Sequence, residues 1–182
     1  MAICILVKLA VFIERDGVLT QTRIENNHQV VPLLPEDFHP RTDLRPSLAR
    51  LKEAGFLLFA TTNQPGLSRG CLYRSDLELM HRKLMEALPL DGVLFCPHDA
   101  QDDCPCGKPK PGLLVEAAYH WHVDLERSFV VGNHWHDAKA ARWAGCVSIL
   151  LESPWINGVH HDFIVPDFNA AADKILRLRQ AG

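Results

Sequence analysis

Two acidic residues, Glu14 and Asp16, follow an apolar run and are separated from each other by a single residue. The run covers residues 9–13 and is typical of a buried strand in a parallel sheet. Side chains alternate between the faces of a strand, so both carboxylates point the same way. Open α/β sheets bind ligands at the carboxyl ends of their strands. The pair therefore predicts a site with one carboxylate as magnesium ligand or nucleophile and the other as general acid or base.

A second group of reactive side chains consists of Cys96, His98, Cys104 and Cys106, which lie close together in the sequence. Zinc takes four thiolate or imidazole ligands in tetrahedral structural sites. The other interpretation is buried cysteines beside a surface histidine, but four such side chains in one short segment favour a metal over both this and disulfides. We expect one structural zinc here. A closed four-ligand site leaves no position for a reacting water, so we do not expect this zinc to be catalytic.

Polar residues also follow other apolar runs. Thr62 and Asn63 end one run, where a hydroxyl and an amide either bind phosphate oxygens or cap a turn. Lys108 comes directly after the cysteine segment, so a metal there would brace the loop that brings its ammonium to the carboxylates. The other interpretation of Lys108, taken without its neighbours, is a solvated loop lysine. Asn133 and Asp137 follow a further run and add an amide and a carboxylate at the same expected edge.

The elements that must position these residues follow from hydrophobic periodicity. Apolar runs of strand length lie at residues 9–13, 56–60, 93–96, 129–131, 147–151 and 163–165. Stripes of helical period lie at residues 44–54, 77–88, 113–121, 138–144 and 172–178. Their alternation predicts an α/β fold, a parallel sheet with helices on both faces, and we expect residues 1–182 to form a single domain. Residues 19–43 are long, polar and proline-containing, and are expected to be a loop that is functional or disordered.

Composition narrows the class of protein. Apolar residues make up 47% of the chain and charged residues 23%, which is ordinary for a soluble globular protein. The net charge of −3 argues against a nucleic-acid partner, which would favour a basic face. Residues 1–8 are apolar but too short to span a bilayer, and they lack the basic start of a signal peptide. We therefore expect them to lead into the first strand of a cytoplasmic, monomeric protein with no membrane partner.

In combination, these motifs resemble the haloacid dehalogenase superfamily of phosphatases over residues 9–145. The resemblance is to the subfamily that contains heptose bisphosphate phosphatases and histidinol-phosphate phosphatase domains. It implies a Rossmann-like fold with no large cap domain, one magnesium ion and one structural zinc. It further implies hydrolysis of a phosphomonoester of a small sugar or metabolite through a phosphorylated carboxylate.

The resemblance also assigns roles by position. Glu14 stands at the nucleophile and Asp16 at the general acid/base. A short glycine-bounded segment, residues 66–70, is similar to a loop of one subfamily. The positions implied to bind phosphate or substrate are Thr62, Asn63, Arg69, Lys108 and Lys110. The positions implied to hold magnesium are Glu14, Asp16, Asn133 and Asp137.

Three positions depart from the family pattern. The family nucleophile is an aspartate where this chain has Glu14, and a magnesium-binding aspartate is replaced by Asn133. An arginine that usually touches the substrate is replaced by Gly107. The extra methylene of glutamate moves its carboxylate by about 1.5 Å, and misplacement by about 1 Å can cost roughly a hundredfold in rate. Asn133 keeps an oxygen ligand but removes a charge, which weakens a magnesium site and lowers the repulsion toward phosphate.

Two hypotheses follow. The first is a phosphatase slowed by the substitutions at positions 14 and 133. The second is a catalytically inactive relative that binds a phosphometabolite or a protein partner. The family residues that remain, Asp16, Thr62, Lys108 and Asp137 among them, favour the first. His134 and His136 are expected to have surface or stacking roles; the alternative is that their imidazoles help a softer metal than magnesium to bind.

Overall fold

The computed structural model describes residues 7–181, so most of the expected lead-in at residues 1–8 lies outside the described residues. Strands and helices alternate along the chain. The strands are β1 (Leu9–Glu14), β2 (Arg23–Glu25), β3 (His28–Val30), β4 (Phe56–Asn63), β5 (Gly92–Cys96), β6 (Phe129–Gly132), β7 (Val147–Leu151) and β8 (Phe163–Val165). The helices are α1 (Arg45–Glu53), α2 (Arg74–Ala87), α3 (Gly112–Trp121), α4 (Trp135–Ala144) and α5 (Phe168–Ala181). Within residues 7–181, no helix is both long enough and apolar enough to cross a bilayer.

Six strands form one parallel sheet in the order β5-β4-β1-β6-β7-β8. Each of the six predicted apolar runs is one of these strands, so the predicted α/β sheet is confirmed. The chain builds β4 and β5 on one side of β1 and then crosses to β6 on the other side. The strand order therefore reverses at β1, and such a switch point is where open α/β sheets bind ligands.

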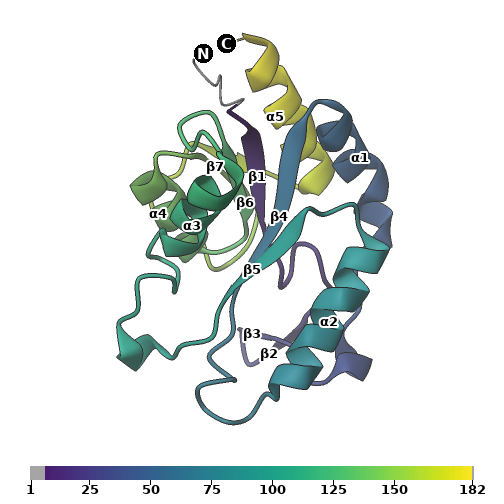
Figure 1. Ribbon diagram of the computed structural model, residues 1–182, viewed down its shortest axis with the longest axis vertical. Coiled ribbons are helices and arrows are strands. Elements are labelled where there is room, and N and C mark those ends of the chain that lie inside the picture. The colour runs from purple at the N-terminus through teal and green to yellow at the C-terminus, as the bar shows by residue number, and fades with distance from the viewer. Residues whose placement is uncertain (1–6, 182) are drawn as a thin grey trace, which may run out of the picture.

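Helices cover both faces of the sheet, as Figure 1 shows. Alternation along β1 explains the two layers: Val11 and Ile13 pack in a core that includes residues of α1, α2 and α5. Ala10 and Phe12 point the other way, into a second core built with α3 and α4. Because β1 is buried on both faces, its sequence is a continuous apolar run rather than an alternating one.

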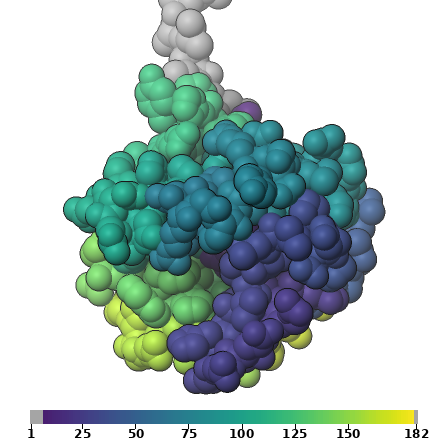
Figure 2. Space-filling model, turned by 90° about the horizontal axis from the view of Figure 1, so that it is seen from below, coloured from purple at the N-terminus to yellow at the C-terminus, as the bar shows by residue number. Residues whose placement is uncertain are grey.

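The segment at residues 19–43 is more ordered than the predicted loop. It contains the antiparallel hairpin β2–β3, whose turn residues Asn26 and Asn27 have φ values of 48° and 62°. Asparagine tolerates this left-handed conformation, which two-residue hairpin turns require. Trp155 Nε1 donates to Asn27 O at 3.3 Å and ties the hairpin to the loop after β7. Figure 2 shows the indigo segment that contains the hairpin spread over the carboxyl end of the sheet. Besides this hairpin, residues 19–43 contain only two short 3-10 turns, Pro35–Asp37 and the start of Thr42–Leu44.

Candidate active site

The carboxyl ends of the central strands bring the predicted polar residues together. Glu14 ends β1, Thr62 lies near the end of β4, and Asn133 follows β6. These three residues line one cavity of about 130 Å³. The hairpin segment contributes Gln29 and Val31 to the same cavity and so covers the edge of the sheet.

Lys108 links two carboxylates at the base of this edge. Its Nζ contacts Glu14 Oε2 and donates to Asp137 Oδ1 at 2.6 Å. The lysine side chain is 1% exposed and the two acidic side chains are 7% and 1% exposed, so the group is almost dry. The sequence predicted that Lys108 would reach the carboxylates, and the structure places it there. It is not the solvated loop lysine of the other interpretation.

The titration of this buried group is perturbed. Burial raises the pKa of Glu14 to about 7, although Lys108 acts in the opposite direction. Burial also disfavours the charged form of Asp137, but the charges of Lys108 and then His136 outweigh it and hold the pKa of this carboxyl well below its usual range. For Lys108, burial is outweighed by Asp137 and Glu14, which raise the pKa of its ammonium. The resulting site holds a firmly charged lysine–aspartate pair beside a glutamate that is partly protonated near neutral pH.

Asp16 faces a different set of partners. Its carboxylate accepts hydrogen bonds from fully buried Arg15, from Nε at 3.0 Å and from Nη2 at 2.9 Å. Thr62 Oγ1 and Gln64 Nε2 also donate to Asp16 Oδ2, at 2.9 and 3.1 Å. The Thr62 hydroxyl that was expected to bind phosphate is therefore engaged with Asp16. These donors hold the Asp16 carboxylate in place, and the Asp16 backbone N–H donates to Glu14 Oε1 at 3.1 Å.

Asn133 fits the role of a cation ligand. Its Oδ1 is buried and has no hydrogen-bond partner, which is rare for a buried polar atom. The backbone N–H of Asn133 donates to Asp137 Oδ2 at 3.2 Å, which fixes the loop between β6 and α4. Gly132 permits this close approach, because a Cβ there would overlap the Asp137 side chain. An oxygen with a free lone pair, next to buried carboxylates, is the donor set that a divalent cation requires.

Two histidines at the start of α4, His134 just before the helix and His136 in its first turn, form an aromatic stack. The rings of His134 and His136 are parallel, with centroids 4.4 Å apart. His134 stacks in turn on Trp155 at 5.3 Å. Burial, and secondarily His136, lowers the pKa of His134 to about 4, so its imidazole is neutral at neutral pH. The expected stacking role is therefore present, and both rings also line the cavity.

Asn63 holds the loop that carries Lys108. Its Oδ1 accepts the Lys108 backbone N–H at 3.0 Å, and its Nδ2 donates to Lys108 O at 3.0 Å. The side chain was expected to contact substrate, but its amide is occupied by this backbone. Asn63 thus positions the lysine while it also lines the cavity.

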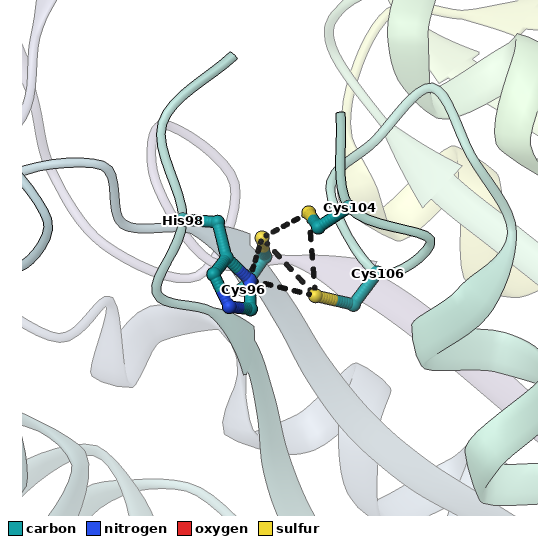
Figure 3. A group of neighbouring side chains, drawn as sticks. All are labelled: Cys96, His98, Cys104 and Cys106. Carbon is teal, nitrogen blue, oxygen red and sulfur yellow. Dashed lines mark hydrogen bonds between the residues drawn. The ribbon is translucent and has the colours of Figure 1, made fainter. Parts of the chain in front are cut away.

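The four predicted zinc ligands converge on one point, as Figure 3 shows. The three sulfur atoms lie 3.3–3.6 Å apart, and His98 Nδ1 is 3.6 and 3.3 Å from those of Cys96 and Cys106. Tetrahedral zinc with Zn–S bonds of about 2.3 Å would space its sulfur atoms by about 3.8 Å, so these side chains fit the ion with a slight expansion. The Gly107 N–H donates to Cys104 Sγ at 3.2 Å, which connects the cluster to the residue before Lys108.

Arg69 and Lys110, both expected to bind substrate, line a second cavity of about 350 Å³ that also reaches Lys108. Each is already paired with an acid in the structure. Arg69 Nη2 donates to Asp99 Oδ1 at 2.9 Å, and Lys110 Nζ donates to Asp103 Oδ1 at 2.5 Å. The cations are therefore near the expected substrate space, with their charges balanced by neighbours.

Sequence reasoning missed several residues of the site. Arg15 is fully buried between Asp16, His81 and the ring of Phe38, although its position between two acids indicated nothing of this. Gln29 was missed because the hairpin was missed. The signal was present: the Asn-Asn pair sits between short segments of strand length.

Comparisons with known proteins agree with one another. The model of the family described as HAD-hydrolase-like matches residues 105–171. A D-glycero-beta-D-manno-heptose-1,7-bisphosphate 7-phosphatase of Pseudomonas aeruginosa is 33% identical over 146 residues, 78% of this chain and 79% of that protein. A protein of the same name from Helicobacter pylori is 34% identical over 174 residues, 91% and 96% of the two chains. A crystal structure of D,D-heptose 1,7-bisphosphate phosphatase from Bordetella bronchiseptica, complexed with magnesium and phosphate, aligns with a TM-score of 0.75 at 28% identity, covering 94% of this chain and 99% of that one.

Proposed function

Because this chain belongs to the haloacid dehalogenase superfamily of hydrolases, we propose that it hydrolyses a phosphomonoester of a small sugar or metabolite, in the manner of a heptose bisphosphate phosphatase. The observation that carries this proposal is the buried Lys108, which joins Glu14 and Asp137 at the strand switch point. An ammonium held between carboxylates beside a cavity is suited to receive a phosphate.

The residues then take the following roles. A Glu14 oxygen attacks phosphorus and forms a carboxyl–phosphate bond while the bond to the leaving alkoxide breaks. Asp16 donates a proton to that alkoxide, so the alcohol leaves neutral. Asp16 next takes a proton from a water molecule that attacks the phosphorus, and inorganic phosphate leaves with Glu14 regenerated. Lys108 and the donors around the cavity balance the charge of the phosphoryl oxygens.

Two metal ions complete the proposal. Glu14, Asn133 and Asp137, with the adjoining Asp16 segment, would hold a magnesium ion, which would lower the repulsion between phosphate and carboxylate. The neutral Asn133 weakens this site relative to one built with a third carboxylate. The second ion is a structural zinc held by Cys96, His98, Cys104 and Cys106. It would fix the loop that delivers Lys108 and would take no part in the chemistry.

We expect turnover to be slow for reasons beyond the length of Glu14. Without a bound cation, burial raises the pKa of Glu14 to about 7, and a neutral carboxyl is a poor nucleophile. Asp16 can act on a leaving group only if its carboxylate is freed from Arg15 and Thr62. Arg69 and Lys110 remain the candidates to contact the leaving group from the adjoining cavity.

The same observations favour a second function, the binding of a phosphometabolite without turnover. Lys108, the cavity and the neutral Asn133 serve binding equally well, whereas the anchored Asp16 and the partly protonated Glu14 disfavour chemistry. We also retain as predictions a cytoplasmic location, a monomeric state and a single domain.

A phosphate-release screen tests the proposal. The protein is assayed against a panel of sugar and metabolite phosphates with magnesium, with manganese and without added metal. Glu14→Gln is the matched control, because it preserves the size of the side chain but removes the nucleophilic charge. We expect slow release that Glu14→Gln abolishes. Release that is unchanged in Glu14→Gln contradicts catalysis at this site, and phosphate binding without release supports the second function.

A further inference from the structure

A cavity of about 530 Å³ lies between α4 and the segment that joins β7 to β8. Ligand sites commonly have volumes of about 300–1,000 Å³, so this cavity has room for a metabolite. It shares no residue with the cavity of Glu14 and Asp16, and only Trp143 with the second cavity near Lys108. The side chains that matter here are Trp135, Lys139, Arg142 and Trp143 of α4, with Asn157 and His160 of the joining segment.

Two indole rings and an ammonium form a stripe along one face of α4. Trp135, Lys139 and Trp143 are spaced by four residues, which places them on the same side of the helix. Lys139 Nζ lies 4.7 Å from the ring centroid of Trp143 and 6.0 Å from that of Trp135. Trp143 is 52% exposed, which is unusual for so large an aromatic side chain. The exposed indole offers apolar surface against which a ligand ring can be buried.

The cations of this cavity are not neutralised by acids. Within residues 7–181, neither Lys139 nor Arg142 forms an ion pair, and no acidic residue lines the cavity. In the second cavity, by contrast, Arg69 and Lys110 are each paired with an aspartate. The whole chain has a net charge of −3, so this cavity is a local positive region on an acidic protein. Such a region attracts anions.

The donors indicate which anion fits. A guanidinium can bind phosphate through two parallel hydrogen bonds, and an ammonium adds a point charge. We propose that this cavity binds a phosphate ester that carries a ring, with Lys139 and Arg142 holding the phosphate and Trp143 packing against the ring. A sugar would pack its C–H face on the indole and a nucleobase its π face. The site is separate from the proposed catalytic site, so the inference goes beyond the proposed function and does not depend on it.

Helix stabilisation accounts for only one of these residues. Arg142 lies in the last turn of α4, where a cation interacts favourably with the helix dipole. Lys139 lies in the middle of the helix, where this effect is lost, and the dipole gives no reason for the exposed Trp143. An unneutralised lysine between two indoles in a cavity is accounted for by an anionic ligand with a ring.

The probes are glucose 6-phosphate and adenosine 5′-monophosphate, with inorganic phosphate as the comparison without a ring. Affinities are measured by isothermal titration calorimetry without added magnesium. The indole N–H signals of the four tryptophans in NMR spectra locate the bound ester. The signals of Trp135 and Trp143 should shift. Trp155 stacks on His134, which lines the cavity of Glu14, so its signal reports binding at the catalytic site instead.

Charge removal tests the phosphate contacts. Lys139→Gln combined with Arg142→Gln should weaken the binding of the esters by at least about tenfold. The matched control is Lys174→Gln combined with Arg177→Gln, which have the same three-residue spacing on α5 and do not line the cavity. Lys174 also lies over an aromatic ring, with its Nζ 3.8 Å from the centroid of Phe163. The control should leave the affinities unchanged.

Ring removal tests the other half of the proposal. Trp143→Ala should weaken the binding of the better ester by at least about threefold and leave inorganic phosphate unchanged. The ester that binds more tightly identifies the ring as a sugar or a nucleobase, and either result supports the proposal. No binding by the natural chain overturns it, as does equal affinity in the folded Lys139→Gln/Arg142→Gln variant or equal weakening by the control. A titration that shifts Trp155 but neither Trp135 nor Trp143 also overturns it, because the ester would then occupy the catalytic site alone.

Discussion

Glu14→Asp removes one methylene from the carboxylate that the family would use as nucleophile. In the natural chain, Glu14 Oε1 accepts the Asp16 N–H at 3.1 Å and Oε2 contacts Lys108, so the longer side chain fills the distance from strand end to ammonium. The substitution withdraws the carboxylate by about 1.5 Å, one carbon–carbon bond. This opens space for a phosphate in a cavity of only about 130 Å³.

The size of the effect follows from the displacement. Misplacement by about 1 Å costs roughly a hundredfold, or about 2.7 kcal/mol of barrier. Lys108 loses part of its contact with position 14 but keeps Asp137 at 2.6 Å, which limits the disturbance. We therefore expect low activity in the natural chain and a gain in kcat/KM of at least about tenfold in Glu14→Asp. Adding Asn133→Asp should raise it further, but not additively, because both positions would serve one ion.

Phosphate release is measured for the natural chain, both single variants and the double variant, with magnesium and one common substrate panel. Efficient magnesium-dependent turnover by the natural chain would refute the reasoning, since it would mean that the site already fits glutamate. So would a loss of activity in Glu14→Asp. A double variant that is inactive on every phosphoester would point to a lost substrate contact, with Gly107 the first position to examine.

Three further predictions concern stability. Cys104→Ser should lower both the melting temperature and the zinc content found by elemental analysis, because it removes one ligand of the cluster. Cys71 is exposed and lies outside the cluster, so Cys71→Ser should change neither quantity. A natural chain without zinc would contradict this prediction. Lys108→Met should lower the free energy of unfolding in urea by about 3–5 kcal/mol at pH 7, because it leaves the buried Asp137 carboxylate, and the ionised fraction of Glu14, without a cation. The loss should be smaller at pH 5, where the raised pKa of Glu14 keeps this side chain protonated, and equal stability at pH 7 would contradict the buried pair. Burial, and secondarily the charge of Arg15, lowers the pKa of His81 from 6.5 to about 4 in the folded protein. Between pH 6.5 and pH 4 the unfolded chain therefore binds more protons at this residue than the folded chain does. The free energy of unfolding should fall by up to about 3 kcal/mol as the pH drops through this range. Non-titrating His81→Gln should lose less stability between pH 7 and pH 4.5, and an identical loss in both proteins would contradict the assignment.

The sheet and the zinc cluster could be predicted because their signals are local. A strand buried on both faces must be apolar throughout, as residues 9–13 are, and the four metal ligands lie within one short segment. The gathering of Glu14, Lys108 and Asp137 also followed from topology, since the carboxyl ends of parallel strands meet at one edge.

Other features depend on partners that are distant in sequence. Lys108 was expected to reach the carboxylates, but no sequence signal indicated that its side chain would be buried between Glu14 and Asp137. Asn63 offered an amide of the right type for a substrate, but the backbone of Lys108 lies close enough to use both ends of that amide. The periodicity of the sequence does not indicate that the Lys108 backbone lies beside the Asn63 side chain.

Arg15 shows most clearly why the two functional hypotheses are hard to separate by sequence. A residue between two acids that share a strand face would ordinarily point away from them, on the opposite face. The chain turns at Gly17, whose φ is 81°, and Asp16 is brought onto the Arg15 guanidinium instead. The carboxylate proposed as general acid/base is thereby held by the residue next to it, while Lys108, proposed to attract phosphate, contacts Glu14 and lines the adjoining cavity. A protein that only binds the phosphometabolite and one that hydrolyses it would then share the same fold. They would differ in whether the Asp16 carboxylate is released from Arg15 and in the length of the side chain at position 14.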